Sequence, residues 1–281
     1  MTQVKWLIEP EVFQQDTEEL VQSLEKLGVE HQICSFGRPY EEFIKVFKDE
    51  DCVVFYGSLQ FAKIIKREAK WIPGVYCNLP KFECLYYYPR FGQHLLNSEY
   101  LMLPLGELKR HEKWIFDNVI ANDKVFIRPS SGSKSFTGKV VKNSEWDKVL
   151  RELKFHNDPE TLVIVASPAN ITHEWRIVVA DNKVITASLY KENDKMVRSN
   201  KVPIEVLNYA QGVLDSVKYN PDFVWTLDIC KAEDNFKVLE VGSFSCAGLY
   251  ACDPELIINA VNHVALKEYD SYKIPLHGQN S

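Results

Sequence analysis

Residues 223–242 read FVWTLDICKAEDNFKVLEVG, the pattern of two antiparallel strands joined by a tight turn. Apolar residues recur on both sides of a polar stretch around Asp234, which favours a turn at that point. A turn centred on Asp234 places Asp228 directly opposite Glu240. The predicted hairpin therefore brings two carboxylates face to face.

Opposed carboxylates of this kind need a positive charge between them. Like charges directly across a sheet, with Cβ atoms about 5 Å apart, destabilise it. The apolar neighbours Trp225, Leu227 and Ile229 argue against full solvation of the pair. Mg²⁺ prefers hard oxygen ligands and takes one or two carboxylates, completed by water and phosphate oxygens. We therefore predict a metal site at Asp228 and Glu240, with a protonated or lysine-paired carboxylate as the alternative.

The loop at residues 128–138, RPSSGSKSFTG, has the composition of an anion site. Glycines let backbone N–H groups approach an anion, while Arg128 and Lys134 would add charge beside hydroxyls such as that of Ser133. The sequence is not a Walker A motif, because that motif precedes a helix and a strand is expected here. Taken alone, the loop is equally compatible with an ordinary hairpin turn.

A second long hairpin is predicted at residues 173–190, HEWRIVVADNKVITASLY, with a turn at Asp181 and Asn182. Glu174 and Arg176 share one face of its first strand, and the sequence VRSN at 197–200 follows the hairpin. An alternating Glu-x-Arg is also common on exposed strands. The order of these motifs along the chain is therefore more informative than any one of them.

The first 105 residues alternate between strands and helices. Strands are predicted at 4–9, 29–34 and 52–56, and helices at 17–27, 41–47 and 58–69, an alternation that favours a parallel sheet covered by helices. The aromatic segment after Trp71 is expected to form loops and short turns, with the tyrosines at 86–88 packing rather than stacking on a ligand. A helix at 106–119, strands at 124–128 and 161–166, and a helix at 203–217 follow.

Composition excludes several classes of protein. The chain has 281 residues and a net charge of -6, which argues against a nucleic-acid partner. With 46% apolar residues it can bury a core, and no leader or membrane-spanning stretch is recognised. Seven cysteines in no metal-site spacing indicate reduced thiols in the cytoplasm.

In chain order, the anion loop, the apolar strand at 161–166, Glu-x-Arg, Arg-Ser-Asn and the opposed acids resemble the ATP-grasp superfamily over roughly residues 106–265. The spacing is most similar to ribosomal-protein glutamate ligases and glutathione synthetases. The sequence EWRIVV also looks like a little-characterised phage and bacterial group. The resemblance implies an α/β and α+β ATP-grasp fold, with a pre-ATP-grasp domain at 1–105, an N-lobe at 106–168 and a C-lobe at 169–275.

The resemblance also implies ATP and Mg²⁺ as cofactors and gives a role to each matching position. Asp228 and Glu240 would hold the metal, while Arg176 and Arg198 would stabilise charge on the transferred phosphoryl group. Lys134 would close over the nucleotide. The positions implied to contact the nucleotide are Arg128, Ser133, Lys134, Val165, Ala166, Glu174, Arg198, Ser199 and Asn200.

Two positions depart from the family pattern. Arg128 stands where the family has a lysine, which keeps the charge but replaces a point donor with a planar fork. Gly242 stands where an asparagine usually ligates metal, so that this ligand is replaced by water or by Ser243. The second departure weakens the expectation of a second metal ion.

The function implied is that of an ATP- and Mg²⁺-dependent carboxylate–amine ligase that forms an acyl phosphate. Its partners would be a small-molecule, peptide or protein carboxylate and an amine acceptor, with no nucleic acid and no membrane. Two alternatives stay open: a nucleotide-binding regulatory module without turnover, suggested by Gly242, and an ATP-grasp kinase. The sequence does not indicate the substrates or the oligomeric state.

Overall fold

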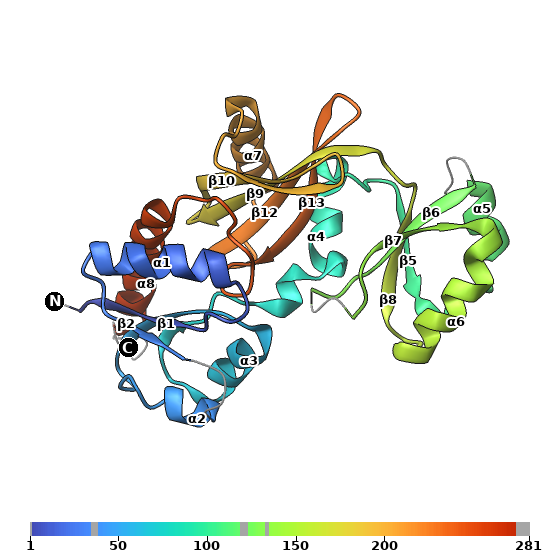
Figure 1. The fold of residues 1–281 in the computed structure, drawn as a ribbon. Helices are drawn as coiled ribbons and strands as arrows, with labels where there is room; N and C mark the ends of the chain where they lie inside the picture. Colours follow the sequence, from blue (N-terminus) through green and yellow to red (C-terminus); the bar gives the residue numbers. More distant parts are fainter. Residues whose placement is uncertain (1, 35–38, 119–122, 133–134, 274–281) are drawn as a thin grey trace, which may run out of the picture. The chain divides into compact units, whose positions relative to one another are not determined.

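The computed structural model describes residues 2–34, 39–118, 123–132 and 135–273 (Figure 1). The chain divides into two compact units. Unit 1 comprises residues 1–78, 173–229 and 241–281, and unit 2 comprises residues 79–172 and 230–240. Each unit is therefore built from segments that lie far apart in the sequence. The predicted three-domain division stays a prediction.

Unit 1 begins with the parallel sheet that the sequence predicts, in the order β2-β1-β3-β4. Its strands are β1 (Val4–Ile8), β2 (His31–Ile33), β3 (Cys52–Tyr56) and β4 (Ile72–Gly74). The covering helices are α1 (Gln14–Lys26), α2 (Tyr40–Phe43), α3 (Leu59–Glu68) and α8 (Pro254–Lys273). Trp6 and Ile8 pack with α1 and α8, while Leu7 packs with α2 and α3, so the sheet has a helical layer on each face.

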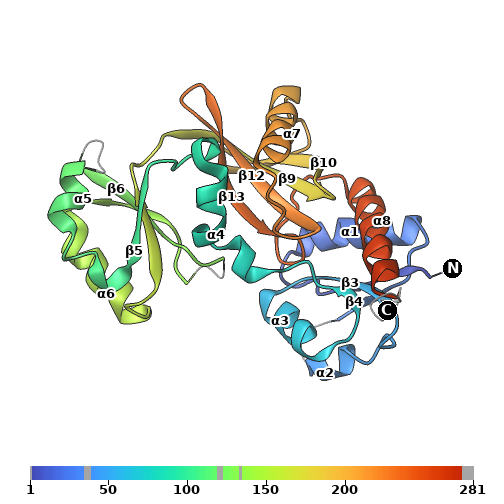
Figure 2. The same cartoon turned by 180° about the vertical axis from the view of Figure 1, so that it is seen from behind.

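Local sequence explains where these helices begin and end. Ser58 caps α3 by accepting from Phe61 N at 3.1 Å, and Gly28, with φ +66°, follows the end of α1. The helix predicted at 41–47 is shorter than expected and covers only α2. Helix α8 was not predicted, although Asp253 caps it by accepting from Glu255 N and Leu256 N. Figure 2 shows α8 beside α1, which it contacts.

A five-stranded sheet has the order β11-β10-β9-β12-β13. Its strands are β9 (Ile171–Ala180), β10 (Lys183–Glu192), β11 (Lys195–Ser199), β12 (Val224–Ala232) and β13 (Asn235–Ser243). Both predicted hairpins are confirmed: Asp181 and Asn182 form the first turn with φ of 47° and 61°, and Glu233 has φ 49° in the second. Helix α7 (Ile204–Val217) confirms the predicted helix at 203–217 and contacts β10.

Unit 2 contains an antiparallel sheet in the order β5-β8-β6-β7. Its strands are β5 (Tyr100–Pro104), β6 (Lys124–Pro129), β7 (Lys139–Lys142) and β8 (Leu162–Ala166). Helices α5 (Glu112–Asn118) and α6 (Trp146–His156) cover it with Ile115, Trp146 and Leu150. The strands predicted at 124–128 and 161–166 are confirmed, whereas β5 was not predicted.

Two expectations about unit 2 are wrong. The aromatic segment expected to form loops contains helix α4 (Cys84–Phe91), in which Tyr87 and Tyr88 are buried and Tyr86 is exposed. The helix expected at 106–119 is instead a 3₁₀ turn followed by α5. The 3₁₀ turns are η1 (Leu79–Phe82), η2 (Gly92–His94), η3 (Leu105–Glu107) and η4 (Asn143–Glu145).

All seven cysteines carry free thiols, and six of them are buried. Burial raises the pKa of Cys34, Cys52 and Cys252 to about 12 in each case. Within the described part of the chain, no helix is both long and apolar enough to cross a bilayer.

Candidate functional site

Arg176 and Asp228 form a bidentate ion pair inside unit 1. Strands β9 and β12 are neighbours in the sheet, which brings the two side chains together. Arg176 Nε donates to Asp228 Oδ1 at 2.6 Å, and Nη2 donates to Oδ2 at 2.9 Å. Their side chains are only 11% and 7% exposed. Burial opposes the charge on Arg176, but the attraction of Asp228 prevails and raises the arginine pKa.

The remaining contacts of Arg176 hold the guanidinium firmly. Nη1 donates to Gly248 O at 2.7 Å. The guanidinium carbon lies 5.8 Å and 5.5 Å from the ring centroids of Tyr190 and Tyr250, which stack on each other. Three of its donor nitrogens are thus engaged by the protein. This arrangement suits a residue that positions Asp228 better than one that moves to meet a ligand.

Glu174 lies two residues before Arg176 on the same strand and is also buried. Its Oε2 accepts from Tyr190 Oη at 2.6 Å, and its Oε1 pairs with Lys191 Nζ at 3.0 Å. Burial raises the pKa of Tyr190, and the nearby charges of Asp228 and Glu174 raise it further. Tyr190 therefore stays a neutral hydroxyl that donates to Glu174.

Arg128 and Glu240 form a second ion pair, inside unit 2. Arg128 Nη2, at the end of β6, donates to Glu240 Oε1 on β13 at 2.9 Å, and both side chains are largely buried. Burial opposes the charge on Arg128, yet its pKa is raised because Tyr87 and Glu240 favour the charged form. The predicted phosphate ligand and a predicted metal ligand thus meet directly.

Each predicted metal carboxylate therefore has a guanidinium partner, which was not among the alternatives drawn from the sequence. The donor set still fits Mg²⁺, because ionised carboxylates retain lone pairs for a hard cation. Among the described residues, no group of three or more His, Cys, Asp or Glu side chains converges on a metal position. Any further ligands would be water and phosphate oxygens.

Gly242 lies beside a buried hydroxyl. A Cβ at position 242 would stand 2.9 Å from Thr226 Oγ1, closer than real Cβ contacts allow. Thr226 on β12 is 2% exposed. The space that a side chain at 242 would need is therefore already taken by Thr226.

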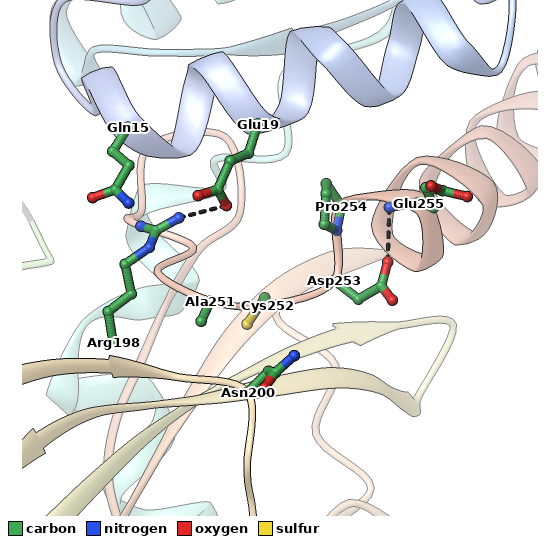
Figure 3. A pocket seen from close by; sticks show the side chains of 9 residues that line it. All are labelled: Gln15, Glu19, Arg198, Asn200, Ala251, Cys252, Asp253, Pro254 and Glu255. Carbon is green, nitrogen blue, oxygen red and sulfur yellow. Dashed lines mark hydrogen bonds and ion pairs between the residues drawn. The ribbon is translucent and has the colours of Figure 1, made fainter.

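Arg198 is placed at a different part of unit 1, on strand β11. It pairs with Asp16 Oδ1 and, at 2.5 Å, with Glu19 Oε2, both on helix α1. Arg198 lines an open pocket of about 500 Å³, shown in Figure 3. Asn200 lines the same pocket, whereas Ser199 Oγ accepts from Lys201 N. Arg198 and Arg176, both predicted to be catalytic, therefore have separate sets of partners.

The remaining predicted residues lie on or near the sheet of unit 2. Val165 and Ala166 are buried in β8, between β5 and β6, so their strand fixes where the following backbone begins. Ser133 and Lys134 lie outside the described residues. The structure thus joins Arg128 to Glu240 and Arg176 to Asp228.

Sequence comparison agrees with this geometry. Residues 110–260, more than half of the chain, match a family model described as an "ATP-grasp domain", the second family of its clade. The chain belongs to the ATP-grasp superfamily. A search by sequence among curated proteins finds no match.

The ATP-grasp chain is also similar to solved ligase structures across nearly its whole length. D-cycloserine synthetase DcsG matches with a TM-score of 0.62 and 12% identity, covering 93% of this chain and 99% of that one. The D-alanine–D-alanine ligase from Bacillus anthracis matches with 0.61 and 10%, covering 97% and 100%. The ATP-grasp ligase PsnB, complexed with a minimal precursor, matches with 0.60 and 12%, covering 93% and 98%. At these identities the likeness shows the fold, and it confirms the predicted ATP-grasp architecture.

Several residues of the site were missed from the sequence. Asp16, Glu19, Tyr190, Gly248 and Tyr250 all contact predicted site residues. The aromatic Tyr190 offered a weak signal, because it lies in the same hairpin as Glu174 and Arg176. Asp16 offered none, since it contacts Arg198 from 182 residues away.

Proposed function

We propose that this ATP-grasp chain is an ATP- and Mg²⁺-dependent ligase that joins a carboxylate to an amine through an acyl phosphate. The observation that carries the proposal is the meeting of Arg176 with Asp228 and of Arg128 with Glu240, four residues to which the family resemblance gives nucleotide, metal or catalytic roles. The matched family supports use of ATP. The ligases among the similar structures support C–N bond formation, in the cytoplasm where ATP is available.

The substrate class follows more loosely from the similar structures. One of them is a D-alanine–D-alanine ligase, and another is PsnB in complex with a precursor peptide. We propose a small-molecule, peptide or protein carboxylate as the acid and an amine as the acceptor.

The chain's own residues would act by positioning and charge neutralisation. Asp228 and Glu240 would hold Mg²⁺, which when bound screens the negative charge of the phosphates. Arg128 would turn from Glu240 toward phosphate oxygens, for which its planar fork is suited. Arg176 would keep Asp228 oriented, while Arg198 would act on the charge that develops on the transferred phosphoryl group.

The nucleotide contacts complete the proposal. Val165 and Ala166 would set the adenine hinge at the end of β8, and Ser133 and Lys134 would close over the phosphates. Glu174, Ser199 and Asn200 would contact the nucleotide from unit 1.

The test is Mg²⁺-dependent formation of ADP and free phosphate in the presence of candidate acids and amines. We expect Asp228→Asn to abolish turnover, because a neutral amide is a poor ligand for Mg²⁺. Asp234→Asn, in the exposed turn of the same hairpin, is the matched control and should retain full activity. Thermal unfolding of both variants separates loss of chemistry from loss of fold, and normal turnover in Asp228→Asn would remove the metal assignment.

Gly242 favours a second candidate, a nucleotide-binding module without turnover. No side chain at position 242 can ligate metal, and Thr226 fills the adjacent space. Binding of Mg-ATP by calorimetry without phosphate release, across all acids and amines tried, would support the module. ADP formed without free phosphate, together with a stable phosphoester, would point to a kinase instead.

A further inference from the structure

A single peptide group connects helix α1 to the ion pair at Asp228. This group joins Gly248 to Leu249, in the loop that follows β13. Leu249 N donates to Asp16 Oδ2 at 2.6 Å, while Gly248 O accepts from Arg176 Nη1 at 2.7 Å. Because a peptide group is planar and stiff, the two hydrogen bonds hold opposite ends of one rigid body.

Asp16 is built into this loop more deeply than an ordinary helix residue would be. It lies in the first turn of α1, and its side chain is only 9% exposed. Oδ2 also accepts from Tyr250 N at 3.2 Å. Tyr250 has φ 54°, a left-handed conformation that is unfavourable for a bulky side chain, so the hydrogen bonds from Asp16 help to hold it.

Tyr250 links the turn to the same arginine by a second route. Its ring stacks on Tyr190 with centroids 4.8 Å apart, and both rings lie near the Arg176 guanidinium. A shift of the loop would therefore disturb both the carbonyl that accepts from Arg176 and the aromatic surface beside it.

The charges along this connection alternate in sign. Arg198 pairs with Asp16, Asp16 accepts from the peptide group, that group accepts from Arg176, and Arg176 pairs with Asp228. In a buried setting such chains polarise one another, so a negative charge at the N–H end makes the carbonyl a stronger acceptor. Loss of the Asp16 charge should weaken the bond that Gly248 makes to Arg176.

We propose that Asp16 is a positioning residue for Asp228, acting through the Gly248–Leu249 peptide group and Arg176. The part of the proposal that concerns metal affinity rests on the function proposed above, because it takes Asp228 as a metal ligand. Asp16 itself touches no reacting atom.

The experiment compares Asp16→Asn with Glu19→Gln. Glu19 lies on the same helix and pairs with the same Arg198, so Glu19→Gln removes one partner of that arginine and leaves the carboxylate that accepts from Leu249 and Tyr250. In the ligand-free protein, NMR would measure solvent exchange of the Arg176 Nε–H, which is bound to Asp228. We expect Asp16→Asn to lose protection at this group and Glu19→Gln to keep it.

The second readout is the Mg²⁺ dependence of ATP binding by calorimetry. We expect Asp16→Asn to weaken the apparent Mg²⁺ affinity by about threefold to tenfold, a coupling of ordinary size. Glu19→Gln should match the unmodified protein. Equal protection and equal Mg²⁺ affinity in the two variants would overturn the proposal.

Two further arms keep the outcome unambiguous. Should Asp16→Asn fail to fold, Asp16→Glu keeps the charge but displaces it by one methylene; partial loss of protection supports the proposal, and full protection overturns it. If the unmodified protein binds no Mg-ATP, the proposed function fails, while the exchange of the Arg176 Nε–H still tests the role of Asp16.

Discussion

At the scale of single residues, the predicted metal carboxylates are held by guanidinium groups. Arg176 uses both oxygens of Asp228, and Arg128 uses one oxygen of Glu240. The identities of all four residues could be predicted from the sequence, because their types and spacing match a known pattern. Their pairing could not, since it depends on β9 lying next to β12 and on β6 approaching β13.

Removing one partner of the Arg128–Glu240 pair should lower stability. Arg128→Ala leaves a largely buried carboxylate without its cation, which in comparable cases destabilises a fold by about 3–5 kcal/mol. Chemical denaturation would measure the loss.

The double variant Arg128→Ala, Glu240→Gln supplies the control for that measurement. Neutralising the orphaned carboxylate should recover a large part of the lost stability. Simple additivity of the two single changes would show that the ion pair contributes little.

At the scale of elements, hairpins were predicted well and helices less so. The turn at Asp181 and Asn182 has a local signature, because positive φ is tolerated by Asp and Asn. Helix α4 carries Pro89 and three consecutive tyrosines, a composition that favours loops, and it is a helix because Tyr87, Tyr88 and Phe91 bury their rings together. Such tertiary packing overrides local propensity.

The hairpin of β12 and β13 gives a prediction about Gly242. Gly242→Ala places a Cβ 2.9 Å from Thr226 Oγ1, so we expect a loss of about 1–3 kcal/mol in unfolding free energy from overpacking. Thermal or chemical unfolding would detect it.

A second change should relieve this contact. Thr226→Ala removes the hydroxyl, and the double variant should therefore be more stable than Gly242→Ala alone. If Gly242→Ala is as stable as the unmodified chain, the hairpin has room that the structure does not show.

At the scale of the whole molecule, segments distant in sequence meet within unit 1. Asp222, which precedes β12, accepts from Asn78 N at 3.2 Å and from its own neighbour Phe223 N at 2.9 Å. Burial raises the pKa of Asp222 to about 7. Such long-range meetings are what sequence patterns do not encode, which is also why the role of α8 was missed.

The raised pKa makes global stability depend on pH. In the folded state Asp222 binds a proton that the unfolded chain releases near pH 4, so its contribution is present below about pH 4 and is lost as pH rises toward 7. We expect the unfolding free energy of the unmodified protein to fall by about 2–4 kcal/mol over this range relative to Asp222→Asn. Parallel pH profiles for the two proteins would contradict the assignment.

The two arginine–carboxylate pairs also bear on how the protein survives without its cofactor. Acidic metal sites commonly repel themselves apart when the ion leaves, so such proteins unfold on chelation. Here Arg176 and Arg128 already balance Asp228 and Glu240. A cell depleted of magnesium would therefore hold this chain folded and idle, ready to resume work when the ion returns.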